Sequence, residues 1–332
     1  MSIPLQKILI VQTAFIGDVI LASALLESLH QTFPEAKIDF VLRKGNEGLF
    51  KEHPFLNTIY IWNKKESKLK NLFKLVQDIR KEEYTYIINL QRFFSSGFIT
   101  ALSRGKQKIG FDKNPLSWLF TTKIKHEIGN GGHEVWRNQK LIEAFSVQHP
   151  VNPKLYPSTQ DFDKVLQYKT DDYICVAPAS VWFTKQFPVA KWIEFINQVP
   201  EKYKVYILGS SSDQKLTMEI RNSVNRGGME SLCGKLSFLE SAALMKNAVM
   251  NYVNDSAPLH IASAMNAPVA ALFCSTVPEF GFGPLSDASH VIQLTEKLTC
   301  RPCGLHGKRK CPEGHFKCGY GIDINAMLSL LK

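Results

Sequence analysis

Short runs of β-branched and other apolar residues alternate with longer amphipathic segments along most of this chain, in two successive series. A short apolar run bounded by turn residues is typical of a buried strand, and apolar residues three or four positions apart predict a helix. Because consecutive strand–helix–strand units build a parallel sheet covered by helices, the alternation predicts an α/β protein with two doubly wound sheets. We expect strands at residues 7–12, 37–42, 58–62, 84–90, 108–111, 173–177, 204–208, 249–253 and 269–273, and helices at 19–33, 189–199, 211–225, 239–247 and 258–265.

The boundary between the two series is expected between residues 149 and 170, a stretch with three prolines and little periodicity. We therefore predict one Rossmann-like domain over residues 1–160, a second over 161–320 and a C-terminal helix over 321–332. Ligands of such sheets bind at the carboxyl ends of the strands, so we expect them in the cleft between the two domains.

The chain has 40 Lys and Arg against 30 Asp and Glu, a net charge of +10, so we expect an anionic partner. Charge alone does not separate nucleic acid, a phosphate-bearing substrate and a membrane surface. Residues 1–150 hold 21 basic and 14 acidic residues, which places +7 of the charge in the first half. An apolar content of 45% excludes a disordered chain.

The location of the protein is predicted from three features. The apolar run at residues 8–11 is too short for a signal peptide. Residues 256–278 contain no Asp, Glu, Lys or Arg, but prolines and a histidine divide them into a helix and a strand, so we reject a membrane span. Seven cysteines without a secretory signal favour a reducing cytosol over a disulfide framework. We predict a cytoplasmic protein.

A glycine and an aspartate follow the first expected strand. Gly17 permits a tight turn, after which Asp18 lies at the start of a helix, at the carboxyl end of a strand. The pattern is not GxGxxG, so the dinucleotide-binding fingerprint is absent. Two interpretations of Asp18 remain open. It caps the helix, where a carboxylate is favoured, or it is a general base held on a rigid element.

The loop after the first strand of the second series carries hydroxyl groups and a lysine. Lys185 is suited to offset the charge of a diphosphate, and Ser180 and Thr184 are suited to donate hydrogen bonds to it. The alternative is a solvated loop with no ligand.

A third motif, Asn254 to His260, lies between an expected buried strand and a helix. Ser256 is a good N-cap, and a helix amino terminus is an anion site. Asp255 is placed to hold sugar hydroxyls beside such an anion. His260 is more often a packed core residue than a catalyst, so we keep it as a minor candidate.

Four cysteines lie close together near the C-terminus, in two pairs. The second pair is separated by six residues rather than by the two to four that are usual in zinc sites. A structural zinc site and reduced cysteines packed in a loop both remain open, with the second favoured. We therefore predict no metal and keep these residues as weak candidate ligands: Cys300, Cys303, Cys311 and Cys318.

The densest basic patch contains five lysines between residues 64 and 74. Leu69, Leu72, Phe73 and Val76 recur there at helical spacing. The pattern is typical of an ordinary amphipathic helix with a solvated lysine face. It also fits an element that lies on a membrane surface or faces a phosphate group.

Together the four motifs resemble the ADP-heptose:lipopolysaccharide heptosyltransferases of glycosyltransferase family 9. The strand with Gly-Asp, the loop ending Lys-x-x-Pro and the Asn-Asp-Ser segment of that family match residues 10–18, 179–188 and 254–260. The cysteine tail resembles members that add the second inner-core heptose. Ala179 and Ala257 stand where the family has glycine, so each adds a methyl group near the expected phosphate without removing a side-chain role.

The resemblance implies a GT-B fold, in which two Rossmann-like domains face each other across a cleft. It implies transfer of heptose from ADP-L-glycero-β-D-manno-heptose with inversion, and Asp18 as the general base. The donor would be bound without a metal or other cofactor, its diphosphate by Lys185 and the helix start and its hydroxyls by Asp255. The residues assigned in this way are Ser180, Thr184, Lys185, Asp255, Ser256, Ala257 and His260 for the donor, and Lys64, Lys68, Arg92 and Arg104 for the acceptor.

The leading hypothesis is a heptosyltransferase of lipopolysaccharide inner-core synthesis, peripheral at the inner face of the inner membrane. We expect ADP-heptose as donor, a Kdo- and heptose-bearing lipid A as acceptor (the second heptose, onto Hep-Kdo2-lipid A) and an anionic membrane surface as partner. One alternative is a family relative that uses another nucleotide sugar. A second is a basic nucleotide- or nucleic-acid-binding protein without catalysis. We expect no nucleic acid, because only Trp62 and Phe73 lie near the lysines and no RNA-binding signature is present.

Overall fold

The computed structural model describes residues 6–130, 132–146 and 151–331. These residues form two compact units. Unit 1 contains the described residues up to 128 and from 132 to 156, and unit 2 contains those from 157 onward together with 129 and 130. The first five residues, and residues 149 and 150 of the expected boundary stretch, lie outside the described residues.

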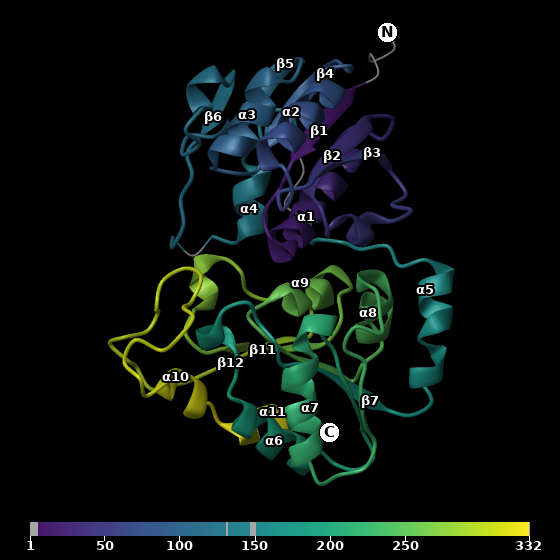
Figure 1. Ribbon diagram of the computed structural model, residues 1–332, viewed down its shortest axis with the longest axis vertical. Coiled ribbons are helices and arrows are strands. Elements are labelled where there is room, and N and C mark those ends of the chain that lie inside the picture. The colour runs from purple at the N-terminus through teal and green to yellow at the C-terminus, as the bar shows by residue number, and fades with distance from the viewer. Residues whose placement is uncertain (1–5, 131, 147–150, 332) are drawn as a thin grey trace. The chain divides into compact units, whose positions relative to one another are not determined.

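Unit 1 is built around a six-stranded parallel sheet in the order β3-β2-β1-β4-β5-β6 (Figure 1). This is the strand order of the Rossmann fold. The elements are β1 Lys7–Val11, β2 Lys37–Arg43, β3 Leu56–Trp62, β4 Tyr84–Asn89, β5 Gly105–Phe111 and β6 Thr122–Ile124, with α1 Ile16–Thr32, α2 Lys68–Ile79, α3 Phe94–Leu102 and α4 Glu134–Gln139.

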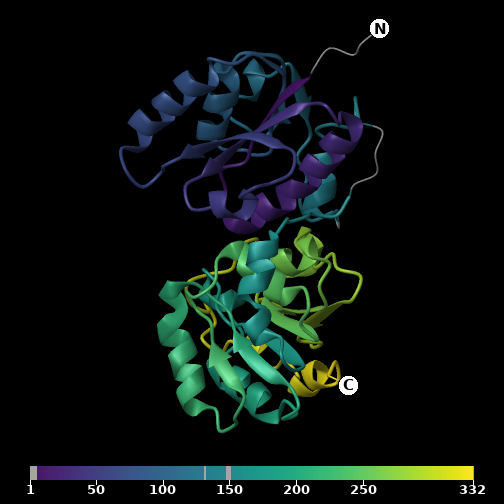
Figure 2. The ribbon, with the colours of Figure 1, turned by 90° about the vertical axis from the view of Figure 1, so that its right-hand side faces the viewer.

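Helices cover both faces of this sheet, which is why β1 is almost entirely apolar. Leu9 and Val11 pack into a buried cluster with residues of α2 and α3 such as Ile79 and Ile99. Side chains alternate along a strand, so Ile8 and Ile10 point to the opposite face. Figure 2 shows α2 and α3, in blue, on one side of the sheet and α1, in purple, on the other.

Unit 2 repeats the same plan with a parallel sheet in the order β12-β11-β10-β7-β8-β9. Counted from β7, this is again the Rossmann order. The elements are β7 Tyr173–Ala177, β8 Lys204–Ile207, β9 Met229–Ser231, β10 Met250–Asn254, β11 Val269–Phe273 and β12 Ser289–Gln293, with α5 Thr159–Lys164, α6 Val189–Gln198, α7 Gln214–Ser223, α8 Phe238–Met245, α9 Ala257–Ala264, α10 Lys317–Tyr320 and α11 Ile324–Leu328.

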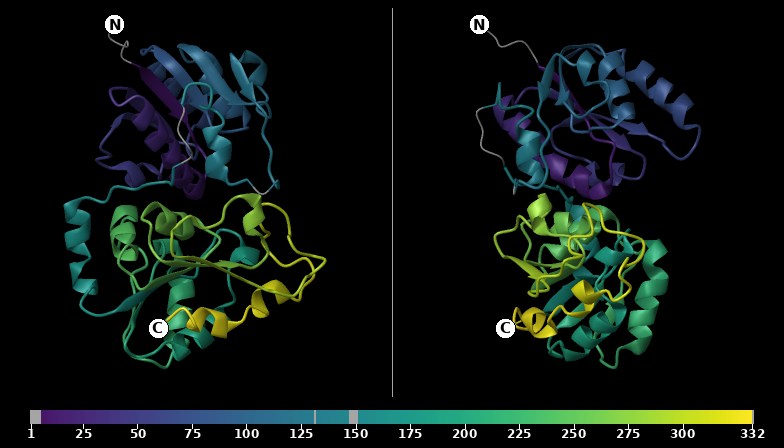
Figure 3. Two further views of the ribbon diagram at one scale, coloured as in Figure 1. Left: turned by 180° about the vertical axis from the view of Figure 1, so that it is seen from behind. Right: turned by 90° about the vertical axis from the view of Figure 1, so that its left-hand side faces the viewer.

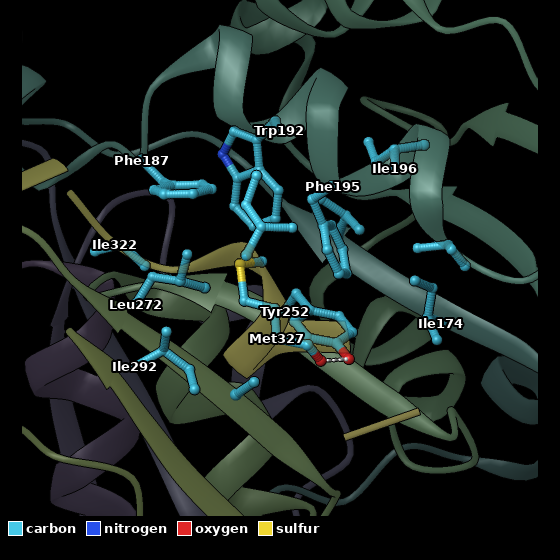
Figure 4. Packing of buried hydrophobic residues seen from close by; sticks show 14 of the residues in the cluster. Ile174, Phe187, Trp192, Phe195, Ile196, Tyr252, Leu272, Ile292, Ile322 and Met327 are labelled. Atoms are coloured by element: carbon cyan, nitrogen blue, oxygen red, sulfur yellow. Dashed lines mark hydrogen bonds between the residues drawn. The ribbon is translucent and has the colours of Figure 1, made fainter. Parts of the chain in front are cut away.

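The core of unit 2 joins the sheet to the C-terminal segment, which Figure 3 shows in yellow along this unit. Trp192 and Phe195 of α6 pack against Tyr252 of β10, and the Phe195 and Tyr252 rings are 4.6 Å apart (Figure 4). The Tyr252 hydroxyl donates a hydrogen bond of 2.8 Å to the carbonyl of Met327 in α11. The C-terminal segment therefore completes this core.

The structure confirms the predicted α/β class, the two doubly wound parallel sheets and all nine expected strands within one or two residues at each end, apart from the earlier start of β5. Strands β6, β9 and β12 were not expected. The expected helix start at residue 19 is wrong. Helix α1 begins at Ile16, so Gly17 lies in its first turn and not in a tight turn before the helix.

Residues 256–278 do divide into a helix and a strand, α9 and β11. No helix in the described ranges has the length and apolar character needed to span a bilayer.

Candidate functional site

The carboxyl edge of the sheet in unit 1 carries the Gly-Asp motif. Strand β1 ends at Val11, and α1 begins five residues later. Asp18 is the third residue of α1 and is half-buried, whereas the N-cap position belongs to Phe15, which makes no side-chain capping bond. Asp18 is therefore not the N-cap of the helix. It lies in the first turn, where the free N–H groups and the helix dipole favour a carboxylate.

Three side chains hold the loop that precedes Asp18. Gln91, which follows β4, accepts hydrogen bonds from both the N–H and the hydroxyl of Thr13, at 3.2 and 2.7 Å. Lys64 Nζ donates to the Thr13 carbonyl at 2.6 Å, and Asn46 Nδ2 donates to the Ala14 carbonyl at 3.2 Å. These donors and acceptors come from the chain after β2, β3 and β4, so neighbouring strand ends fix the backbone that leads into Asp18.

The predicted acceptor residues are not all at this edge. Lys64, Lys68 and Arg92 follow the carboxyl ends of β3 and β4, as Thr13 follows that of β1. Arg104 directly precedes β5, and its carbonyl accepts a hydrogen bond from Tyr84, the first residue of β4. In a parallel sheet that position is the opposite edge. The structure does not bring Arg104 to the edge that carries Asp18.

Lys64 differs from an ordinary surface lysine. Its ammonium group lies 4.6 Å from the centre of the Trp62 ring, in addition to its bond with Thr13. Burial, and then the positive charges of Arg43 and Lys68, lower the pKa of Lys64 to about 8. The accumulation of positive charge at this edge is a favourable environment for an anion.

The carboxyl edge of the sheet in unit 2 carries an ion pair between a partly buried lysine and a buried aspartate. Lys185 Nζ lies 2.8 Å from Asp255 Oδ2, with side-chain exposures of 16% and 6%. The Thr276 hydroxyl donates to the same oxygen at 2.6 Å. Lys185 follows β7, Asp255 follows β10 and Thr276 follows β11, and these three strands are neighbours in the sheet. The structure thus brings two predicted donor residues into contact.

The loop of residues 178–187 is fixed mainly by Asn254, the last residue of β10. Asn254 Nδ2 donates to the Pro178 carbonyl at 2.7 Å, and Asn254 Oδ1 accepts from the N–H of Phe187 at 2.9 Å. Gln186 also donates to the Ser180 carbonyl at 2.6 Å. One buried amide therefore sets both ends of the loop that carries Ser180, Thr184 and Lys185.

Thr184 connects this loop to the segment before α10. Its hydroxyl accepts hydrogen bonds from Ser275 at 2.9 Å and from the N–H of Lys308 at 2.7 Å. Gly307 packs directly against it, since a Cβ at Gly307 would lie 2.9 Å from Lys185 Cγ and 3.0 Å from Thr184 Oγ1. A glycine is required there both by this contact and by a φ of +74°.

The amino terminus of α9 adjoins Asp255. Ser256 is the N-cap, but its hydroxyl bonds the carbonyls of Ala179 and Asn254 at 3.4 Å and does not cap the helix. Ala257 is the first helical residue, and the proline in the first turn lacks an N–H. His260 is buried, and its ring lies 6.4 Å from that of Phe282. The first turn of α9 thus offers backbone N–H groups and a partial positive charge beside the Lys185–Asp255 pair.

The four C-terminal cysteines, all reduced, line one cavity of about 350 Å³. Burial raises the pKa of the Cys318 thiol to about 11. The other three are Cys300, Cys303 and Cys311, and the Cys303 thiol donates to the Cys300 carbonyl. Over the described ranges, no three His, Cys, Asp or Glu side chains form a group that could hold a metal ion.

Sequence reasoning missed Gln91, Asn254 and Thr276 as residues of these edges. Asn254 was part of a recognised motif but had no assigned role, and it directly follows the buried strand expected at residues 249–253, which was the available signal. Gln91 and Thr276 also lie just beyond strands. Their roles depend on which strands are neighbours, and no local pattern reveals that.

The chain is similar to proteins of one known enzyme family. Residues 72–315, most of the chain, match the family model of glycosyltransferase family 9 (heptosyltransferase). The chain is 27% identical to lipopolysaccharide heptosyltransferase 3 of Escherichia coli over 79% of this chain and 82% of that protein. It is 22% identical to lipopolysaccharide heptosyltransferase 2 of Escherichia coli (strain K12) over 97% and 99% of the two chains.

The solved structures agree on the fold. The structure of the E. coli ADP-heptose lps heptosyltransferase II superposes with a TM-score of 0.81 at 20% identity, over 98% of this chain and 97% of that one. A family 9 glycosyl transferase from Veillonella parvula DSM 2008 gives a TM-score of 0.79 at 17% identity, over 88% and 87%.

Two Rossmann-like sheets of this kind, in a chain that matches this family model, place it among the glycosyltransferases with the GT-B fold. The class follows from the fold together with the match to the family model. The chain belongs to glycosyltransferase family 9, the heptosyltransferase family, as the resemblance of its motifs had indicated.

Proposed function

We propose that this enzyme transfers heptose from ADP-L-glycero-β-D-manno-heptose to the inner core of lipopolysaccharide. The observation that carries the proposal is the buried Lys185–Asp255 pair beside the amino terminus of α9. A cation next to a helix start suits a diphosphate, and a carboxylate next to it suits sugar hydroxyls. The names of the relatives, lipopolysaccharide heptosyltransferases 2 and 3, support the same donor and acceptor class.

In the proposed donor complex, the ADP diphosphate lies at the first turn of α9. Lys185 Nζ and the N–H groups of Ser256 and Ala257 bind its oxygens, with Ser180 and Thr184 close by on the adjoining loop. Asp255 accepts hydrogen bonds from the hydroxyls of the heptose. No metal is needed in this scheme, because the lysine and the helix terminus supply the positive charge. His260 packs beneath the helix start as a supporting residue.

The proposed chemical step is a single inverting displacement. Asp18 takes the proton of the acceptor hydroxyl as its oxygen attacks C1 of the heptose. The bond between C1 and the diphosphate oxygen breaks, and its electrons leave with ADP. Lys185 stabilises the charge that develops on the leaving oxygen. Inversion requires one base and no covalent sugar–enzyme intermediate, so a single carboxylate is sufficient.

The acceptor is proposed to bind to unit 1, where Lys64, Lys68 and Arg92 lie at the edge that carries Asp18. The lipopolysaccharide core carries phosphate groups and Kdo carboxylates, which such cations bind. Because this acceptor is linked to lipid A, we propose a cytoplasmic enzyme that works at the inner face of the inner membrane.

The cysteine tail supports transfer of the second heptose, onto Hep-Kdo2-lipid A. A second candidate acceptor already carries two heptoses. The 27% identity to the E. coli heptosyltransferase 3 favours that acceptor.

The test is a transfer assay with purified enzyme, ADP-heptose and three lipid A acceptors that carry Kdo2, Hep-Kdo2 or Hep2-Kdo2. We expect heptose to be added to the Hep-Kdo2 acceptor. Transfer only to the Hep2-Kdo2 acceptor would establish the second candidate. Failure with all three, together with thermal stabilisation by UDP but not by ADP, would reject ADP-heptose as the donor.

A further inference from the structure

Helix α2 leaves two large apolar side chains in solvent. The amphipathic pattern of residues 64–76 predicts that Leu69, Leu72, Phe73 and Val76 share one buried face. The structure buries Leu72 and Val76 but leaves Leu69 and Phe73 exposed by 67% and 55%. The structure thus has the expected amphipathic helix with a buried face, but Leu69 and Phe73 lie outside that face, and their exposure needs another explanation.

Helix α3 extends this exposed apolar surface. The ring of Phe98 lies 5.4 Å from that of Phe73 in α2 and 6.2 Å from that of Phe94. Phe94 is exposed by 57%, and Phe98 is partly buried against the core below. Leu69, Phe73, Phe94 and Phe98 therefore form one continuous surface across two helices, here called the aromatic patch. A monomeric soluble domain rarely exposes adjoining aromatic residues without a partner for them.

Lysines border the aromatic patch. Lys70 and Lys74 each follow a patch residue of α2, and both are exposed. Each helical residue advances by about 100°, so these two lysines form the next row around the helix. The only acidic residue between positions 64 and 74 is Glu66, against five lysines. An aromatic row beside a lysine row is the arrangement of helices that lie in a membrane interface.

The aromatic patch lies near the carboxyl edge of the sheet of unit 1. Both α2 and α3 begin at the carboxyl edge of the sheet of unit 1, the edge at which Thr13 and Asp18 follow β1. Figure 2 shows the two helices together on one face of that sheet. A surface held against the aromatic patch would therefore adjoin the edge where the acceptor is proposed to bind.

We propose that the aromatic patch and its lysine row dock unit 1 on an anionic lipid bilayer. The aromatic rings enter the boundary between headgroups and acyl chains, and the lysines bind lipid phosphates. Charge complementarity selects this partner. A second copy of a chain with +10 net charge would place lysine rows against each other, which opposes self-association. The docking role rests on the proposed lipid-linked acceptor, but binding itself does not depend on catalysis.

The first experiment measures sedimentation of the full-length enzyme with vesicles. One set contains phosphatidylglycerol and phosphatidylethanolamine, and the other contains only phosphatidylcholine. We expect binding to the first set and little to the second. The double variant Phe73→Ser/Phe94→Ser should bind at least about tenfold more weakly, because both rings leave the interface. The control Leu166→Ser removes an equally exposed apolar side chain from unit 2 and should bind like the wild type.

The second experiment tests the lysine row. Lys70→Glu/Lys74→Glu should weaken binding to the anionic vesicles by about tenfold or more, and added salt should weaken binding of the wild type. The control Lys215→Glu/Lys297→Glu makes the same change of charge on unit 2 and should have a much smaller effect. Circular dichroism and thermal unfolding confirm that each variant is folded, as expected for exposed positions.

The outcomes separate this inference from the proposed function. The Phe73→Ser/Phe94→Ser variant should transfer heptose to a short, soluble core oligosaccharide at the wild-type rate. Equal binding of wild type and both variants to anionic vesicles would overturn the docking proposal while leaving the transferase intact. The docking proposal would also be overturned if the wild type dimerised and did not bind vesicles, and if the Phe73→Ser/Phe94→Ser variant were monomeric. That result would show that a second copy of the chain covers the aromatic patch.

Discussion

At the scale of single residues, the carboxyl edge of unit 2 is organised by the ion pair between Lys185 and the buried Asp255. Lys185 and Asp255 are 70 positions apart in the chain, and their contact is made by adjacent strands in the sheet. Thr276 adds a second donor to the same carboxylate oxygen. Removal of one partner from a buried pair leaves an uncompensated charge, which costs more than the pair contributes.

The variant Lys185→Ala tests this pair. We expect the free energy of unfolding to fall by about 2 kcal/mol, because Asp255 keeps its hydrogen bond from Thr276 but loses its cation. ADP affinity should fall by about tenfold to a hundredfold, the contribution of a charged hydrogen bond. Urea denaturation and calorimetric titration with ADP measure the two effects.

Its control is Lys191→Ala, which breaks a surface pair with Glu194 on the same unit. That variant should lose less than about 0.5 kcal/mol and bind ADP normally. Equal effects of the two substitutions would contradict a special role for the Lys185–Asp255 pair.

The residue Gln91 provides a test of how the proposed base, Asp18, is positioned. Gln91→Leu removes the acceptor of both Thr13 hydrogen bonds, so the loop before Asp18 should become less well fixed. We expect a fall in kcat of about tenfold, with ADP affinity unchanged because the donor edge is in the other unit. Gln91→Glu keeps an acceptor oxygen and should restore most of the rate. A loss of ADP binding, or the same kcat in both variants, would show that Gln91 does not act through the loop.

At the scale of elements, the segment before α10 supports the loop of residues 178–187. Gly304 and Gly307 both have positive φ angles, +96° and +74°. A Cβ at Gly304 would meet no atom of the described residues within 4 Å, whereas at Gly307 it would press on Lys185 and Thr184. Alanine at position 304 therefore tests backbone strain alone. Alanine at position 307 tests the same strain together with contact with the loop of residues 178–187.

We expect Gly304→Ala to cost about 1 kcal/mol of stability, from the left-handed backbone alone, and to leave ADP affinity unchanged. Gly307→Ala should cost about 1 kcal/mol more and weaken ADP binding several-fold, since Lys185 must shift. Thermal unfolding and titration with ADP measure both effects. Indistinguishable ADP affinities for the two variants would contradict a close contact between this segment and Lys185.

The elements differ in how far they could be predicted. Strands such as β1 and β7 are buried on both faces and stand out as apolar runs, so their positions were predicted within a residue. Strands β6, β9 and β12 escaped prediction because they lie toward the sheet edges, are short or carry polar residues, and lack such a run. Motif positions were recognised along the chain, but the partners Gln91 and Thr276 depend on the order of strands, which a local pattern does not encode.

At the scale of the whole molecule, pH acts on stability through a buried histidine in unit 1. His53 packs among the rings of Phe50, Phe55 and Tyr156, and no residue that the structure describes forms a hydrogen bond with either ring nitrogen. Burial, followed by the positive charges of His30 and Lys154, lowers the pKa of His53 from 6.5 to about 4. The folded protein therefore binds this proton less readily than the unfolded chain does.

Stability from this group is complete above pH 6.5 and is lost as the pH falls toward 4, because only the unfolded chain takes up the proton in that interval. The expected loss from His53 alone between pH 7.5 and pH 5 is about 2 kcal/mol. Urea denaturation at the two pH values measures it, with His53→Leu as the comparison. The variant should show a correspondingly smaller loss, and an unchanged loss would contradict this assignment.

The central claim is that Asp18 at the edge of unit 1 activates the acceptor while unit 2 binds ADP-heptose. The most direct test is the rate of heptose transfer by Asp18→Asn, measured together with its ADP affinity. Asparagine keeps the shape of the side chain but does not take a proton, so transfer should fall by about 10²–10⁴-fold with ADP affinity unchanged. Transfer at a near wild-type rate would contradict Asp18 as the general base.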